Sequence, residues 1–354
     1  MSVVLRLIRP GRSTTILRRL LSHTGVVLGA LIAWAGLPLW IAILLLCDLV
    51  RDGLGPRRFI LTRILLFAAG WLACEVAGLG VALGIWLRAL VTRPDPDTYR
   101  SWNFRLQCEW GHALLRIGQT TFGYRFEVTG ADVVTPGPIL LLLRHTSLAD
   151  TVLAVSQISR PHDMVLRYVL KRPLLLDPCI DVVGRRLINY FALRGEKSRS
   201  QFDGVAALAD DLGPKDGILL YPEGTRYTQE KKSALLRKLE RRKRADDLAY
   251  AEGLQHVLPP IRGGFLAVLE RCDLHGSTPD VVFCAHAGFE GSATAKDLLA
   301  GRLLGTKVKI HFWRVPGEEI PSGTEEREAW LRAQWQRMDR TVEALRRGEI
   351  PPRD

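Results

Sequence analysis

The sequence contains few cysteines, and their positions follow no recognisable pattern. Six occur in 354 residues, none of them in a C-x-x-C pair, and two lie inside apolar runs. This arrangement argues against both a zinc site and a disulfide framework. We therefore predict no metal site and a reducing, cytosol-facing environment. The chain also contains no internal repeat and no low-complexity tract, which excludes a repeat array.

Acidic residues are also in deficit. Asp and Glu total 37 against 49 Lys and Arg, which gives a formal net charge of +12. A basic surplus predicts an acidic partner: nucleic acid, anionic lipid or a phosphorylated substrate. Proteins that bind single-stranded nucleic acid interleave aromatic with basic side chains, whereas the basic cluster at residues 233–244 contains no aromatic residue. We therefore predict no nucleic-acid partner.

Two long apolar runs lie in the first quarter of the chain. Residues 24–47 would form a helix roughly 36 Å long, which is enough to cross a bilayer core. Residues 64–87 are comparable but contain Glu75 and four glycines, which favour close helix packing over lipid exposure. A connection containing Gly and Pro joins the two runs. We predict that residues 1–98 form an N-terminal membrane anchor of two hydrophobic helices, about 24–47 and 64–87.

The anchor can be arranged in two ways. Basic residues flank both runs, so the distribution of positive charge selects no orientation. Two membrane spans are favoured; the alternative is a hairpin that dips into one leaflet, bends at Pro38 and keeps its basic ends at the headgroups. Glu75 is expected to be a packed carboxyl that pairs with Arg63 or a backbone group. A cleaved signal peptide fits poorly, because the first run is too long.

The rest of the chain, residues 99–354, has mixed α/β composition. Apolar or alternating runs predict strands at 122–129, 139–143, 164–170, 187–193, 217–221, 281–285 and 308–313, and longer periodic stretches predict helices at 198–212, 228–252 and 325–345. The run at 139–143 is apolar throughout, which is typical of a strand covered on both faces. Alternation of strands and helices predicts an α/β fold with a central mixed sheet and covering helices.

Polar residues follow the strand at 139–143. His145 and Asp150 lie five positions apart, so they would point to different faces of a regular helix and can meet only across a non-helical turn. An imidazole at such a turn could take a proton from a substrate hydroxyl, while the carboxylate fixes its tautomer. The alternative is structural: Ser147 caps the following helix and Asp150 completes a capping box.

A second polar turn follows the strand at 217–221. Glu223, Gly224, Thr225 and Arg226 come directly after Pro222, which ends the strand. Backbone N–H groups near Gly224, the Thr225 hydroxyl and the Arg226 guanidinium would form a cradle for a phosphate. Glu223 is expected to position a basic group. The alternative is an ordinary Pro–Gly loop.

Four sequence blocks, taken in order, resemble those of the glycerolipid acyltransferases of the 1-acylglycerol-3-phosphate (lysophosphatidic acid) acyltransferase type. Residues 145–150 match the H-x4-D motif. Gly184 with residues 191–194 is similar to the second block, residues 221–226 look like the F-P-E-G-T-R block, and residues 256–261 resemble the apolar Pro block. The resemblance extends over about residues 137–335. Residues 167–172 and 223–232 look like the lysocardiolipin and lysophosphatidylinositol acyltransferase branch.

The resemblance implies a reaction. A membrane-bound O-acyltransferase would move a fatty acyl group from acyl-CoA or acyl carrier protein, as co-substrate and without a cofactor, to the free hydroxyl of a lysophospholipid. The expected acceptor is 1-acyl-sn-glycerol-3-phosphate, giving phosphatidic acid. The alternatives are another lysophospholipid acceptor, or a catalytically silent lipid-binding membrane protein. The expected location is the inner (cytoplasmic) membrane, with the catalytic domain on the cytosolic side.

The resemblance also implies roles for individual residues. His145 would act as general base, oriented by Asp150, and Arg194 and Arg226 would hold the acceptor phosphate. The rest of the third block, residues 223–225, would complete the acceptor site. Further candidate site residues are Arg144, Lys171 and Pro259.

Two features leave room for other interpretations. Arg144 stands where the family often has Asn, so it could bind a second anionic group. The basic segment 231–244 could meet anionic headgroups or an acidic acyl carrier, or it could simply be a solvated helix face.

Overall fold

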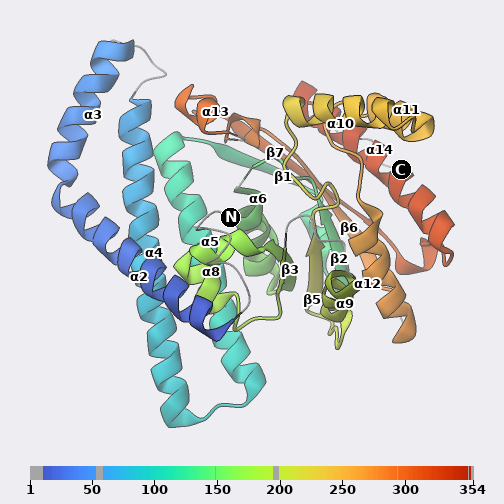
Figure 1. The fold of residues 1–354 in the computed structure, drawn as a ribbon, viewed down its shortest axis with the longest axis horizontal. Coiled ribbons are helices and arrows are strands. Elements are labelled where there is room, and N and C mark those ends of the chain that lie inside the picture. The colour runs from blue at the N-terminus through green and yellow to red at the C-terminus, as the bar shows by residue number, and fades with distance from the viewer. Residues whose placement is uncertain are drawn as a thin grey trace.

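The computed structural model describes residues 11–52, 59–147, 149–193, 199–276, 278–292, 294–349 and 351. Four long helices come first: α2 (Arg12–Ala35), α3 (Leu37–Asp52), α4 (Ile60–Thr92) and α5 (Pro96–Phe122). They lie along one side of an α/β domain, as Figure 1 shows. Two of them, α2 and α4, are long and apolar enough to cross a membrane by length and composition.

The prediction of a single helix over residues 24–47 was wrong. The chain breaks at Gly36, between α2 and α3, and Pro38 explains the break because it has no N–H and its ring crowds the preceding turn. Gly36 fits this corner because a Cβ there would lie 2.4 Å from the indole nitrogen of Trp40. The second predicted helix, residues 64–87, lies inside the longer α4.

The first helices form a layer with one face on the α/β domain. Glu75 of α4 is fully buried and accepts hydrogen bonds from the Trp110 indole (3.1 Å) and the Cys179 backbone N–H (3.2 Å). The expected backbone partner is therefore present, whereas Arg63 donates to the Thr121 carbonyl instead. Asp181 of the α/β domain in turn binds the buried Arg18 of α2 at 2.9 Å.

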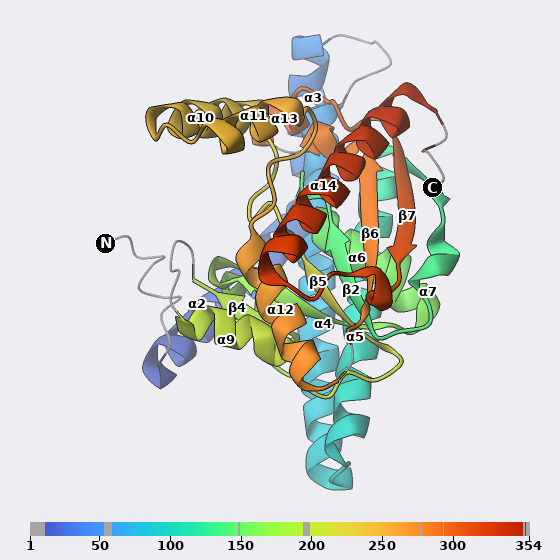
Figure 2. The ribbon, with the colours of Figure 1, turned by 90° about the vertical axis from the view of Figure 1, so that its right-hand side faces the viewer.

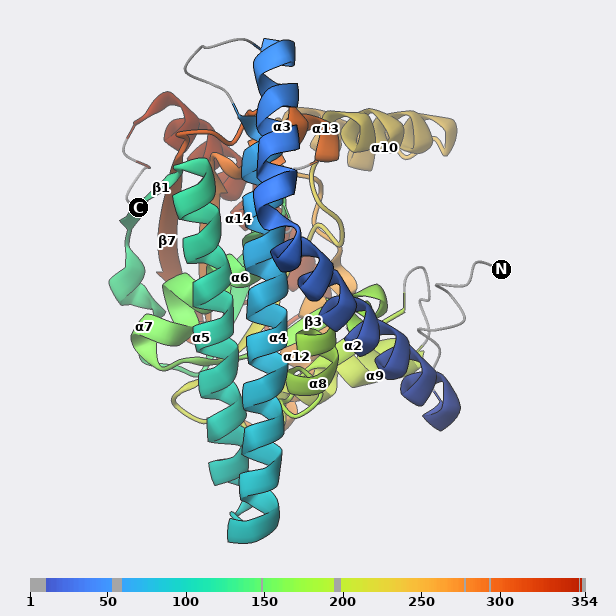
Figure 3. The same cartoon turned by 90° about the vertical axis from the view of Figure 1, so that its left-hand side faces the viewer.

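The opposite face of this layer is apolar and exposed. Figure 3 shows α2, α3 and α4 nearest the viewer on this side of the molecule. Large hydrophobic side chains with at least half of their surface exposed lie on all three helices: Ile16, Leu20, Leu21, Leu28, Leu31, Ile32, Trp34, Leu39, Leu46, Val50, Val81, Leu83, Leu90 and Val91. Such a surface is too large for a monomer in water and is typical of contact with a membrane.

A seven-stranded sheet forms the centre of the α/β domain. Its strands are β1 (Arg125–Thr129), β2 (Ile139–Leu143), β3 (Val165–Lys171), β4 (Tyr190–Ala192), β5 (Asp216–Leu220), β6 (Asp280–Ala287) and β7 (Lys307–Val315). Their order is β1-β7-β6-β2-β5-β3-β4, and only the β6–β7 pair is antiparallel. The predicted α/β class with a mixed sheet is confirmed.

Helices cover both faces of this sheet. The shorter ones are α6 (Ala149–Ala154), α7 (Arg160–His162), α8 (Pro178–Val183), α9 (Arg199–Ala206), α10 (Gln229–Arg241), α11 (Ala245–Gly253), α12 (Arg262–Leu274) and α13 (Ala295–Leu299), and the chain then forms α14 (Thr324–Arg347). Figure 2 shows α12 and α14 in front of the strands, while α5 and α6 pack on the opposite face. The predicted helix 228–252 is two helices, α10 and α11, because the chain turns at Lys243, where φ is +51°.

The sheet also determines where polar groups gather. All five residues of β2 are completely buried, as the apolar run predicts. Because β2, β3, β4, β5 and β6 run parallel, their carboxyl ends meet at one edge, which is where open α/β sheets place their ligands. The residues after β2, β5 and β6 form the site described next.

Candidate active site

The turn after β2 brings His145 and Asp150 together. Residues 144–147 are not helical, and α6 begins only at Ala149. As a result His145 Nδ1 lies 2.9 Å from Asp150 Oδ2, although five positions separate the two residues. The non-helical turn that the spacing requires is therefore present.

Asp150 also holds the turn itself. Its Oδ2 accepts the backbone N–H groups of Thr146 (2.7 Å) and Ser147 (2.9 Å), and its Oδ1 accepts the Ser147 hydroxyl at 3.2 Å. The Ser147 Oγ accepts the N–H of Ala149, so the capping arrangement and the dyad occur together. Burial opposes ionisation of Asp150, but the nearby imidazoles and the Ser147 N–H outweigh it and lower its pKa. The carboxylate is therefore charged.

The geometry assigns the His145 proton. A carboxylate oxygen only accepts, so Nδ1 carries the hydrogen and Nε2 has its lone pair free. The ring lies against Tyr221, with centroids 4.4 Å apart, and 13% of the side chain is exposed. No described residue is hydrogen-bonded to Nε2, which leaves this nitrogen available to a substrate hydroxyl.

The turn after β5 packs directly on the first one. Tyr227 N–H donates to the His145 carbonyl at 2.6 Å, and Gly224 adopts a φ of +63° that favours glycine. The Gly224 N–H donates to the Tyr221 carbonyl. This amide is therefore not available to bind a phosphate, contrary to the expectation. Thr225 Oγ1 instead accepts Lys231 Nζ at 2.8 Å, and its hydroxyl hydrogen can still be donated.

Glu223 does not face an acceptor site. Its side chain is buried, and its two oxygens accept the backbone N–H groups of His145 (2.8 Å) and Leu258 (2.8 Å). Burial raises its pKa to about 8. The prediction that Glu223 positions a basic group or contacts the acceptor is corrected: it joins the two turns to the loop before α12.

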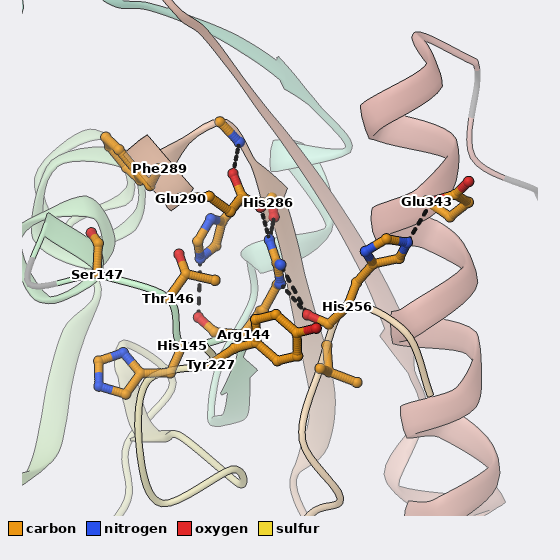
Figure 4. Close-up of polar contacts among 12 residues, drawn as sticks. Arg144, His145, Thr146, Ser147, Tyr227, His256, His286, Phe289, Glu290 and Glu343 are labelled. Atoms are coloured by element: carbon orange, nitrogen blue, oxygen red, sulfur yellow. Dashed lines mark hydrogen bonds and ion pairs between the residues drawn. The ribbon is translucent and has the colours of Figure 1, made fainter. Parts of the chain in front are cut away.

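Arg144 also has a different role from the expected one. Figure 4 shows its buried guanidinium between three segments. It donates to the His256 carbonyl (2.9 Å), to the His286 carbonyl and to Glu290 Oε1 (2.7 Å). These partners occupy the Arg144 guanidinium, so it cannot bind a second anionic group. The expectation that Arg144 binds such a group was wrong.

Three candidate site residues remain, together with the basic segment 231–244. Arg194 lies outside the described residues. Lys171 is exposed and ends β3 at the same edge of the sheet, while Pro259 is half-buried in the loop before α12. In the basic segment, Lys231 and Lys232 point inward, the latter to the Leu254 carbonyl.

Six cations of this segment are exposed. We call them the basic arm: Arg237, Lys238, Arg241, Arg242, Lys243 and Arg244.

Sequence reasoning missed His286. It lies on β6, one residue beyond the predicted strand, and is completely buried. Its Nε2 lies 3.0 Å from the Arg144 carbonyl oxygen and 3.5 Å from Asp150 Oδ1. It belongs to none of the four blocks, so only its place in the fold reveals it.

An apolar cavity of about 490 Å³ lies beside α6, the helix that carries Asp150. It lies between α4, α5, α6 and α8, and it reaches Ala149 and Thr151, which flank Asp150. Its walls are almost entirely hydrophobic and include Phe67, Trp71, Trp110, Leu114, Val155, Leu174, Ile180 and Phe289. The predicted anchor therefore contributes side chains to a cavity of the α/β domain.

Comparison with known proteins identifies the domain. Residues 125–274 match the family model named Acyltransferase. These residues form an acyltransferase domain. Over 259 residues, which are 71% of the chain, it is 25% identical to mouse lysocardiolipin acyltransferase 1, and the match covers 65% of that relative's length. The predicted family is thereby confirmed.

The 1-acyl-sn-glycerophosphate (LPA) acyltransferase PlsC from Thermotoga maritima superposes with a TM-score of 0.49 at 16% identity, over 78% of this chain and 95% of that one.

Proposed function

We propose that this acyltransferase is a membrane-bound enzyme that moves a fatty acyl group from an acyl thioester to the free hydroxyl of a lysophospholipid. The observation that carries the proposal is the His145–Asp150 pair, 2.9 Å apart at the carboxyl edge of the sheet and next to an apolar cavity. The cavity would hold the acyl chain, because its walls are apolar and it leads to the residues beside Asp150.

The dyad supplies acid–base chemistry. His145 Nε2 takes the proton from the acceptor hydroxyl as its oxygen attacks the thioester carbonyl. Asp150 keeps Nδ1 protonated and stabilises the imidazolium that forms. When the tetrahedral intermediate collapses, the C–S bond breaks, and the imidazolium returns the proton to the leaving thiolate. Catalysis of this kind contributes about 100- to 10,000-fold.

The acceptor phosphate would lie at the turn after β5. Thr225 and Lys231 bring a hydroxyl and a cation there, and the resemblance adds Arg226 and Arg194. Cations and hydroxyl donors suit a phosphate monoester, so 1-acyl-sn-glycerol-3-phosphate, which would give phosphatidic acid, is the first acceptor to test. The relative named lysocardiolipin acyltransferase 1 makes another lysophospholipid the alternative.

Membrane association follows from the exposed apolar face of α2, α3 and α4. Their packing supports the one-leaflet alternative, because α4 has buried side chains from Ile60 to Ala82 that contact the α/β domain and its neighbours. A helix held in this way cannot leave the domain to cross the bilayer alone. The inner membrane and a cytosolic catalytic domain remain part of the proposal.

One assay tests the function. Purified protein in detergent micelles would be offered several lysophospholipids with acyl-CoA or acyl carrier protein as donor, and lipid products would be measured by mass spectrometry. We expect transfer by the wild type and loss of transfer in His145→Ala. Equal product from the two proteins would contradict the proposal. Binding of lysolipid without transfer in the wild type would indicate a silent lipid-binding protein.

A further inference from the structure

The two oxygens of Asp150 face two different imidazoles. Oδ2 accepts His145 Nδ1 at 2.9 Å, and Oδ1 lies 3.5 Å from His286 Nε2. The same Nε2 lies 3.0 Å from the Arg144 carbonyl oxygen. His286 thus contacts both the carboxylate of the dyad and the backbone of the residue that precedes His145.

The contacts of His286 determine its protonation. Both neighbours of Nε2 are acceptors, so Nε2 carries the hydrogen. Nδ1 is buried, and no described residue is hydrogen-bonded to it. A second proton would have to sit there without an acceptor, close to the Arg144 guanidinium. Burial, followed by Arg144, lowers the pKa of His286, although Asp150 and Glu290 oppose this. His286 is therefore a neutral imidazole with one N–H.

We propose that His286 is a positioning residue for the reaction, whose Nε2–H holds the Arg144 carbonyl and thereby the turn on which His145 meets Asp150. The inference rests on the proposed acyl transfer. Without His286, the Arg144 carbonyl would lose its donor at 3.0 Å. The turn that begins at Arg144 could then shift, and with it the 2.9 Å contact between His145 Nδ1 and Asp150 Oδ2 that leaves Nε2 unprotonated.

Three substitutions separate this role from simple core packing. His286→Leu keeps a similar volume and removes the donor. His286→Gln can present an amide N–H near the position of Nε2, whereas His286→Asn places its amide near Nδ1, which has no partner. The Gln and Asn variants are thus a matched pair that differ in where the donor lies. The charged groups that face residue 286 are Asp150 from α6, Arg144 after β2 and Glu290 after β6, and all three stay unchanged.

The kinetic expectations are specific. His286→Leu should lower kcat about 10- to 100-fold, less than loss of the base itself, with KM changed less than about threefold. Gln should restore most of kcat, and Asn should behave like Leu. Wild-type kinetics in the Leu variant, or equal behaviour of Gln and Asn, would overturn the proposal; if Leu does not fold, the Gln–Asn pair decides.

A readout without turnover separates this inference from the proposed function. Nitrogen NMR of the full chain labelled with ¹⁵N-histidine reports the tautomer of each imidazole, with His145 assigned from His145→Gln. We expect the Nδ1–H form of His145 in the wild type and in His286→Gln, and a mixture of tautomers in His286→Asn. An unchanged His145 tautomer in the Asn variant refutes the positioning role. A wild type with the expected tautomer but no acyl transfer refutes only the proposed function.

Discussion

Replacing Arg144 by Met tests the network that supports the H-x4-D turn. The guanidinium is completely buried and binds two carbonyl groups as well as Glu290. Met keeps an apolar stem of similar length but leaves these three groups without their donor. Removing one partner of a buried ion pair costs about 3–5 kcal/mol. Because 32% of the Glu290 side chain is exposed, we expect the lower end, about 3 kcal/mol.

Thermal unfolding in detergent measures this cost. A loss of about 3 kcal/mol should lower Tm by about 6 °C or more, and kcat should fall because the turn that carries His145 loses its support. Arg144→Lys is the control: it keeps a cation beside Glu290 but cannot reach both carbonyls, so its Tm should be intermediate. A Met variant with the Tm and kcat of the wild type would refute the role assigned to this network.

The pH dependence gives a second check on the same pair. Burial alone would raise the pKa of Glu290, but the Arg144 guanidinium holds it down at about 2. The pKa of Glu in an unfolded chain is about 4.3, so above that pH the ion pair contributes its full stabilisation to the folded state. Its contribution is lost as the pH falls from about 4.3 towards 2. The difference in stability between wild type and Arg144→Met should therefore narrow over this range, and a constant difference would argue against the ion pair.

Two further predictions concern the lipid contacts. Leu174→Trp adds bulk to the wall of the cavity, so the preferred donor should become a shorter acyl chain, measured by competition among thioesters; an unchanged preference would exclude the cavity as the acyl site. Replacing four cations of the basic arm by Gln should weaken binding to anionic vesicles by up to about 1,000-fold, since each cation contributes about 1 kcal/mol near such a surface, while binding to neutral vesicles stays the same. Unchanged binding to anionic vesicles would leave the arm as a solvated helix face.

Local patterns predicted the sheet better than they predicted the contacts of the site. The all-apolar run of β2 and the polar turn after it could be identified because strand burial and turn chemistry are local properties. Glu223 and Arg144 were misassigned because charged residues beside the H-x4-D motif suggest a ligand, whereas their partners are backbone groups and Glu290, all more than 30 positions away along the chain. His286 was missed for the same reason, since its neighbours come from the turn after β2 and from α6.

The anchor and the α/β domain share a cavity wall, and this makes a truncation informative. Phe67, Trp71 and Gly78 of α4 line the cavity opposite α5 and α8, and Gly78 is required there because a Cβ would lie 2.6 Å from the Cys179 sulfur. A chain that begins at residue 93 would expose this apolar surface to water at about 25 cal/mol per Å². We expect it to aggregate or to need detergent, and to lose transfer of long acyl chains even when the His145–Asp150 pair is intact. A monodisperse, fully active residue 93–354 fragment in detergent-free buffer would mean that the first helices attach the enzyme to the membrane without contributing to the acyl site.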